Sequence, residues 1–161
     1  MFIRRLALAV ILPVASACSS DTGVLDPAAE TLRPAVAAAV TAALQDEYHA
    51  EQTYRRVMVD FGTVLPFANI ITAEQRHAAS LRGILRSRGI AVPASEWNVD
   101  NVPRFASVAE ACALAAEAEV ANITLYDELL ALELPADVRT VFTNNRRASL
   151  EGHLPAFNRC R

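Results

Sequence analysis

The sequence predicts an all-α fold, a four-helix bundle made of two antiparallel helix hairpins joined by a long crossover. Three observations carry this prediction. The composition is rich in Ala and Leu and has only five Gly in 161 residues, which favours helices. Four segments with helical start and stop signals follow one another from residue 34 onward. The links between them are short, long and short, and short links join antiparallel neighbours whereas a long link crosses the bundle.

The first predicted hairpin covers residues 34 to 88. Its first helix begins at Pro34, because the fixed φ of proline suits the first turn, and ends before Gly62, a residue typical of helix C-termini. Its second helix runs from residue 66 to residue 88 and ends in the same way, before Gly89.

The second predicted hairpin covers residues 107 to 158. Its first helix opens at Ser107, with Glu110 three residues later as a capping box, and continues to about residue 132. Its second helix begins at Pro135. The link from residue 89 to residue 106 is then the crossover, which makes the arrangement ferritin-like.

The N-terminus has the pattern of a secretory signal peptide over residues 1 to 17. A charged start with Arg4 and Arg5 precedes a short apolar stretch and the small residues 15 to 17 of a cleavage site. Residues 18 to 33 have the composition of a flexible tether, and residues 34 to 161 form the bundle domain. We therefore expect export, with a periplasmic or membrane-anchored product.

Cys18 directly follows the predicted cleavage site, as in the lipobox of bacterial lipoproteins, although Ala15 replaces the usual Leu. A lipid on Cys18 would make the membrane a partner of the protein. Plain secretion, with Cys18 merely adjacent to the cleavage site, and an uncleaved anchor stay open as alternatives. The net charge of −3 on the full chain argues against nucleic-acid binding, which needs a basic face.

A set of acidic residues and histidines has the spacing of metal ligands. Glu74 and His77 are three residues apart and therefore share one helix face. Glu47 and Tyr54 are seven apart on the preceding helix, and the pair of residues 119 and 126 repeats that spacing on a later helix. Buried carboxylates are unfavourable unless a positive charge offsets them, and Glu-x-x-His facing single glutamates is the pattern of dimetal bundles.

We therefore expect two divalent ions, iron or manganese. The predicted ligands are carboxylates and imidazoles from all four helices: Glu47, Glu74, His77, Glu119 and His153. The alternative for each acid is a position on the helix surface. Glu117 is an alternative to Glu119 as the ligand from its helix. Leu150 stands where the fourth helix should carry an acid, so the site is one carboxylate short. His49 is interpreted as a surface histidine.

Tyr54 and Tyr126 are interpreted first as core residues, with a ligand carboxylate as the hydrogen-bond partner that a buried tyrosine needs. They are also the candidate redox residues of the site. A disulfide between Cys112 and Cys160 is predicted, because antiparallel packing about Pro135 brings both cysteines to nearly the same height. The alternative is a small core residue at 112 and a free thiol at 160.

Several segments resemble the DUF2202 ferritin-like domains. They are residues 46 to 54, Phe67-Ala68-Asn69-Ile70 leading into residues 74 to 77, residues 119 to 125, and His153-Leu154-Pro155-Ala156-Phe157. The resemblance covers most of residues 36 to 158 and implies a ferritin-like bundle with a dimetal centre. Val120 and Asn122 depart from the family pattern, which usually has acids there.

Two functions compete at this point. The first is an envelope-located dimetal protein acting in oxygen, peroxide or iron chemistry, as an oxidoreductase or an iron-handling protein. The second is a metal-free helical bundle, a binding or structural lipoprotein. Storage of iron in a closed cage is disfavoured, because a membrane tether is hard to reconcile with a shell.

Overall fold

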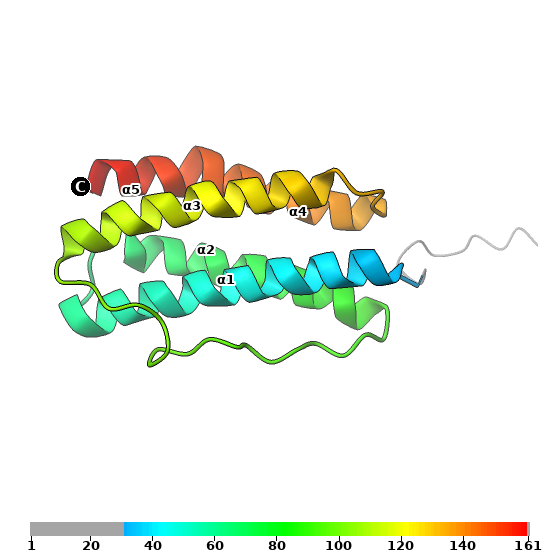
Figure 1. Ribbon diagram of the computed structural model, residues 1–161, viewed down its shortest axis with the longest axis horizontal. Coiled ribbons are helices and arrows are strands. Elements are labelled where there is room, and N and C mark those ends of the chain that lie inside the picture. Colours follow the sequence, from blue (N-terminus) through cyan, green and yellow to red (C-terminus); the bar gives the residue numbers. More distant parts are fainter. Residues whose placement is uncertain (1–30, 161) are drawn as a thin grey trace, which may run out of the picture.

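The computed structural model describes residues 31–160, and all regular structure in that part of the chain is helical (Figure 1). The predicted all-α class is thus confirmed, and the helix ends fall close to the predicted ones. The signal peptide, Cys18 and nearly all of the tether lie outside the described residues. The elements are α1 (Pro34–Phe61), α2 (Phe67–Ser87), α3 (Val108–Leu130), α4 (Ala136–Ala148), the π-helical turn η2 (Ser149–His153) and α5 (Leu154–Cys160).

The predicted stop and start residues act as the sequence suggests. Gly62 and Gly89 have φ values of +81° and +66°, the left-handed region that glycine enters without strain. The Ser107 hydroxyl accepts a hydrogen bond from the Glu110 amide at 3.1 Å. The Glu110 carboxylate in turn accepts from the amide of Ala106 at 2.6 Å, which completes a capping box displaced by one residue.

The helices pack with their axes nearly parallel to the long direction of the molecule (Figure 1). Helices α1 and α2 are antiparallel neighbours, and α3 packs against α4, η2 and α5, which return along it. The segment 88–107 connects the two pairs and runs the length of the bundle along its outside, from the end of α2 to the start of α3. As a result α1 and α3 run in opposite directions, which later decides which side chains meet.

A polar layer separates two apolar clusters in the interior. One cluster contains Leu44, Leu81 and Phe142, and the other contains Val57 and Phe157. On each long helix the buried polar residues fall between the positions that contribute to these two clusters, except Arg56 of α1, which lies beside Val57 and donates to Asp60. The buried polar residues of this middle layer are Glu47, Glu74, Glu119, Asn122, Asn145, Ser149 and His153.

The last predicted helix, from Pro135 to residue 158, is present, since the chain stays helical from Ala136 to Cys160, but its hydrogen-bond pattern changes part-way. Its regular hydrogen bonding widens into the π turn η2 between α4 and α5. Pro155 lies just after this turn, and it lacks the amide that would bond the carbonyl of Glu151. The proline is the physical reason for the break, and the sequence contained that signal.

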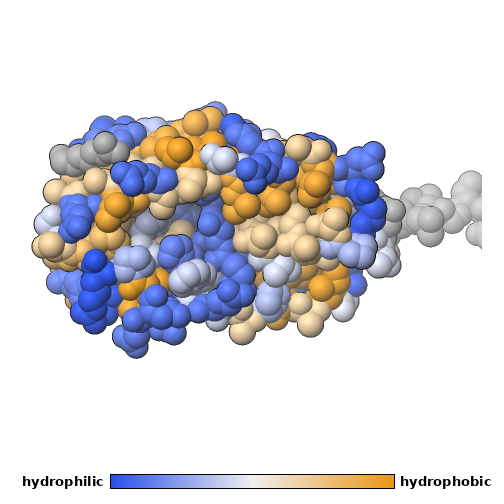
Figure 2. All heavy atoms as spheres, viewed as in Figure 1, coloured by the Kyte–Doolittle hydropathy of each residue, from blue (hydrophilic) through white to orange (hydrophobic). Residues whose placement is uncertain are grey.

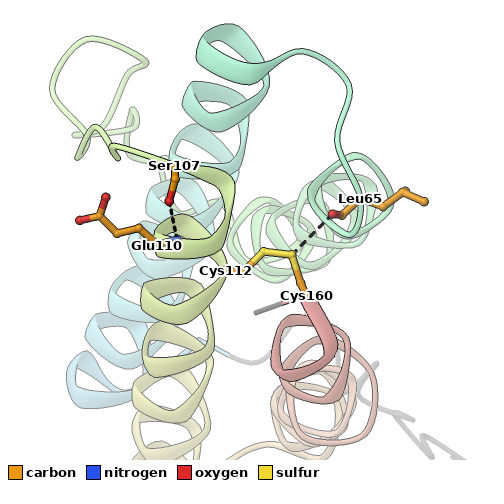
Figure 3. Close-up of a disulfide and its surroundings, with 5 residues drawn as sticks. All are labelled: Leu65, Ser107, Glu110, Cys112 and Cys160. Carbon is orange, nitrogen blue, oxygen red and sulfur yellow. Dashed lines mark hydrogen bonds between the residues drawn. A yellow bond between two sulfur atoms is a disulfide. The ribbon is translucent and has the colours of Figure 1, made fainter.

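Cys112 of α3 and Cys160 of α5 are joined by the predicted disulfide, with their Cα atoms 5.8 Å apart (Figure 3). The bond links the start of α3 to the end of α5. Leu65, in the link between α1 and α2, presents its carbonyl to the Cys160 sulfur at 3.7 Å. Among residues 31–160, the helices include none that is both long and apolar enough to cross a bilayer.

Candidate metal centre

Three carboxylates lie buried in the polar layer. Glu47 is 1%, Glu74 is 2% and Glu119 is 3% exposed, each from a different helix. Glu117, the competing position on α3, is exposed, so the helix turns Glu119 inward instead. Ionised carboxylates at this depth require partners of opposite charge, since desolvation disfavours the charged form.

Glu74 occupies the centre of the layer and faces both histidines. Its Oε1 lies 3.0 Å from Nδ1 of His153, and its Oε2 lies 3.0 Å from Nδ1 of His77. The two imidazole rings are nearly stacked, with centroids 5.5 Å apart. One carboxylate with an oxygen toward each of two histidines has the disposition of a bridging ligand.

The other two acids complete one group on each side of Glu74. Glu47 Oε2 lies 3.3 Å from Nδ1 of His77, and Glu119 Oε2 lies 3.4 Å from Nδ1 of His153. Within each group of three residues the ligand atoms all lie within 4.8 Å of one another. We call Glu47, Glu74 and His77 the His77 half, and Glu74, Glu119 and His153 the His153 half.

Each outer carboxylate is held from behind by a tyrosine. The Tyr54 hydroxyl donates to Glu119 Oε1 at 2.7 Å, and the Tyr126 hydroxyl donates to Glu47 Oε1 at 2.5 Å. Burial raises the pKa of both tyrosines well above the usual value, so both hydroxyls keep their protons and donate. One oxygen of each acid is thereby fixed, and the other is left facing its histidine.

The tyrosines pair across the bundle, not along their own helices. Tyr54 of α1 bonds the acid of α3, and Tyr126 of α3 bonds the acid of α1. This pairing follows from the opposite directions of α1 and α3. In each helix the tyrosine lies seven residues after the glutamate, so antiparallel packing brings the tyrosine of one helix level with the glutamate of the other. A carboxylate partner for each tyrosine was predicted, and the cross-pairing was not.

The distances in both halves fit a shared cation. Atoms bound to one ion at about 2.0–2.2 Å lie roughly 2.8–3.6 Å from each other, as the edges of an octahedron or tetrahedron require. The histidine–carboxylate distances of 3.0, 3.3 and 3.4 Å fall in that interval. Nδ1 of His153 is buried and faces two carboxylate oxygens, without the alignment of a regular hydrogen bond to either. An ion that replaced the proton on this nitrogen would lie between the two acids.

The titration behaviour of the cluster without metal shows how strongly it attracts positive charge. Burial alone would lower the pKa of the two histidines, but the facing carboxylates outweigh it and raise the pKa of His77 to about 9 and that of His153 to about 10. Desolvation raises the pKa of Glu47 to about 7. The two histidines lower the pKa of Glu74 despite its burial. Protons and metal ions therefore compete for the same nitrogens.

Sequence reasoning missed the amide and hydroxyl groups around the acids. Asn145 donates to the Tyr126 hydroxyl at 2.9 Å. Asn122 donates to Asp46 at 2.7 Å and accepts from the hydroxyl of Ser149 at 2.8 Å. The available signal was their helical period, because Asn145 and Ser149 lie three and seven residues after the core residue Phe142.

The position of Leu150 resolves the question of the missing acid. Leu150 is 41% exposed and points away from the cluster, so it does not replace a ligand. The π turn places Ser149 and His153 inward instead. Arg146, another candidate partner for the acids, is bound to Asp127 at the surface at 2.6 Å.

A cavity of about 200 Å³ reaches the cluster. It lies between α1 and α3 beside the end of the crossover, and Figure 2 shows the surface hollowed on this side. Glu74, Glu119 and Tyr54 line it, whereas Glu47, His77 and His153 do not. His49 lines it too, and its ring packs against that of Trp97 at a tilt of 39°, with centroids 4.2 Å apart. Its interpretation as a plain surface histidine is therefore corrected: burial also lowers its pKa.

Comparison of this chain with protein-family models, curated proteins and solved structures found no match. The resemblance to DUF2202 ferritin-like domains therefore stays a prediction. The assignment of a role depends on the geometry of the cluster itself.

Proposed function

We propose that this protein is a carboxylate-bridged dimetal protein of the ferritin-like, DUF2202 type, which binds two iron or manganese ions and acts in oxygen, peroxide or iron chemistry. The ligands are the residues of the two halves. Glu74 bridges, Glu47 and His77 hold one ion, and Glu119 and His153 hold the other. The all-helical bundle and the two Glu/Glu/His groups support this reading.

The observation that carries the proposal is the arrangement about Glu74. Each of its oxygens lies 3.0 Å from a different histidine nitrogen, and each of those nitrogens also faces one outer carboxylate, at 3.3 Å for His77 and 3.4 Å for His153. One outer acid and one imidazole on each side of a shared carboxylate are a donor set that suits a pair of divalent ions.

The donor set favours iron or manganese. Carboxylate oxygens and imidazole nitrogens without thiolate suit these ions. Five side chains for two ions leave coordination positions free for a small ligand. When bound, such a pair of ions supplies the electrons and Lewis acidity for oxygen or peroxide chemistry. The protein's own groups orient the acids through Tyr54 and Tyr126, whose protonated side chains are also placed to carry an electron.

The second candidate is a metal-free bundle with a binding or structural role. It is favoured by the raised pKa of His77 and His153, since two protonated histidines can balance the buried acids without a metal. The fourth helix also lacks the second Glu-x-x-His motif. For both candidates we propose a location in the cell envelope, with a lipid on Cys18. Replacement of Cys18 by Ala should then move the protein from membranes to the soluble fraction.

Metal analysis and thermal melting of one pair of variants separate the two candidates. Protein purified without chelators should contain close to two ions per chain, and added iron or manganese should raise its melting temperature. At a hundredfold excess over Kd the gain is roughly 3 kcal/mol. Glu74→Gln should abolish both the bound metal and the rise in melting temperature. Glu117→Gln, an exposed acid on α3, should change neither.

A melting temperature that iron, manganese and zinc all leave unmoved would reject the dimetal function in favour of the metal-free bundle. Because Gln has nearly the size of Glu but no charge and only one acceptor oxygen, the Glu74→Gln variant removes the ligand without opening a cavity in the core.

A further inference from the structure

The cavity beside the His153 half has the features of a binding site for an organic molecule. Its volume of about 200 Å³ exceeds the roughly 150 Å³ of an engineered protein cavity that binds benzene. A site that served only water or dioxygen would need far less space. The cavity is therefore large enough for one aromatic ring with a substituent.

The walls of the cavity divide into an apolar side and a polar floor. Phe105, Leu114 and Ala118 form the apolar side, on the crossover and α3. Glu74, Glu119 and Asn122 lie on the polar side. Leu114 is 43% exposed, one of the few large apolar side chains that the bundle leaves uncovered among the described residues. An amphipathic ligand with a flat apolar body and a polar head matches this division.

Thr53 supplies an independent sign of a ligand. Its side chain lines the cavity from α1, and its Oγ1 is buried without a hydrogen-bond partner. Threonine hydroxyls in a helix usually bond a carbonyl one turn earlier, as Thr140 of α4 does at 2.8 Å. A buried hydroxyl that forgoes this bond is free to bond a group inside the cavity.

The charges near the floor indicate a neutral ligand. Asp46, Glu74 and Glu119 line the cavity, and Glu47 lies behind them in the cluster. The four acids carry four negative charges when ionised, which disfavour an anion. Two divalent ions would offset these four charges and would remove the attraction for a cation. A neutral molecule fits both conditions.

We propose that this cavity binds a small neutral aromatic alcohol or phenol, with its ring against Phe105 and Leu114 and its hydroxyl toward Thr53 and Glu119, next to the His153 half. This inference rests on the proposed function, because it names the substrate class of that same site. It also assigns the two halves different tasks, since the cavity does not reach Glu47 or His77.

The test uses para-fluorophenol as the probe and fluorine NMR as the readout, on metal-free and manganese-loaded protein. The expected result is saturable binding in both forms, with strong manganese-induced relaxation of the fluorine in the loaded form. Ala118→Phe fills the cavity from its exposed wall and should abolish binding. Ala121→Phe places the same ring at an exposed position of α3 outside the cavity and should leave binding intact.

A second pair of variants tests the polar contact. Thr53→Val removes the hydroxyl at constant shape and should weaken binding about fivefold to tenfold, the size of one hydrogen bond. Thr140→Val removes an exposed hydroxyl from α4 and should leave the affinity unchanged. Circular dichroism of all four variants checks that the bundle is intact.

Two results would overturn the inference: the absence of saturable binding to the unmodified protein, which would mean that the cavity holds only solvent, and binding that Ala118→Phe does not affect. Failure of the proposed function has a different signature. Saturable binding that Ala118→Phe abolishes, with no uptake of manganese by the protein, would support the cavity as a site and reject the dimetal centre.

Discussion

The two halves of the cluster have the same ligand types and differ in their surroundings. In the His77 half, Glu47 is backed by Tyr126 and Asn145, and it does not line the cavity of the neighbouring half. In the His153 half, the acid is backed by a tyrosine alone, its histidine comes from a π turn, and its free side opens to the cavity. The two halves thus differ in the polar groups behind the acid and in access to the cavity.

The two halves share an acid, a histidine and a tyrosine, and they differ in the groups around these side chains. The differences are Asn145, the π turn before Pro155 and the crossover beside the cavity, none of which belongs to the seven-residue Glu/Tyr spacing. Under the proposed function, one ion would be reached from the cavity and the other would be held among polar side chains.

The largest expected effect is the dependence of stability on pH, because both halves bind protons in the absence of metal. A pKa raised in the folded state adds stability that is complete below the unfolded value and disappears as pH rises through the folded value. For the histidines that window runs from about 6.5 up to 9 for His77 and 10 for His153, and for Glu47 from 4.5 up to about 7. Urea unfolding of metal-free protein should therefore show stability falling from mildly acidic pH toward pH 10.

Metal-loaded protein should show the opposite trend, because loss of the same protons favours the ions. Replacement of both histidines by Gln should flatten both pH profiles. A metal-free profile that rises between about pH 7 and 9 would show that His77 and His153 are not protonated in the folded state at neutral pH.

The second effect concerns the disulfide, which belongs to the His153 side of the molecule. The bond spans 48 residues, and a loop of that length corresponds to about 4 kcal/mol in the chain-entropy model. A variant with Cys112→Ser and Cys160→Ser should lose stability of that order in urea unfolding. Since α5 follows directly after His153, metal affinity should fall more in the His153 half than in the His77 half. Equal loss from both halves would show that the disulfide acts on the whole bundle.

The third effect compares the two tyrosines. Tyr54→Phe removes one hydrogen bond to Glu119, whereas Tyr126→Phe removes the bond to Glu47 and also takes a partner from Asn145. We expect a loss of about 1 kcal/mol for the first and about 2–3 kcal/mol for the second, measured by chemical unfolding of metal-free protein. Equal losses would mean that Asn145 does not reinforce the His77 half.

The smallest effect is expected at residue 150, where the sequence analysis expected an acid and found Leu150. Leu150→Glu restores a Glu-x-x-His spacing, yet the side chain is on the surface. Metal content should stay unchanged, and stability should shift by no more than about 0.5 kcal/mol. A gain of bound metal would show that the π turn can rewind into a regular helix and bring residue 150 inward.

The sequence was sufficient for the helices and for the residues that meet in the cluster, because both depend on helical periodicity. Glu47, Glu74 and Glu119 each fall between apolar positions on their own helix, so burial of one face brings all three inward. The contacts between helices were not predictable in this way. The pairing of Tyr54 with Glu119 depends on the direction and height of α3 relative to α1, which no local pattern encodes.

The cavity and the polar network could not be predicted from the sequence either. Their residues come from α1, α3 and the crossover, and a gap in packing has no signature in any one segment. The π turn is different, since Pro155 inside a helical pattern was visible. Its consequence for Leu150 could have been foreseen from the lost hydrogen bond.

The crossed tyrosine–glutamate pairs also fix the alignment of the two hairpins. A slip of α3 along α1 by one helical turn, about 5.4 Å, would separate both pairs at once and take the carboxylate acceptors from two buried tyrosine hydroxyls. Apolar side chains such as Ala and Leu would tolerate such a shift far better. The polar layer thus stabilises one register between the two hairpins. As a consequence, the hairpins dock correctly only when the cluster also forms.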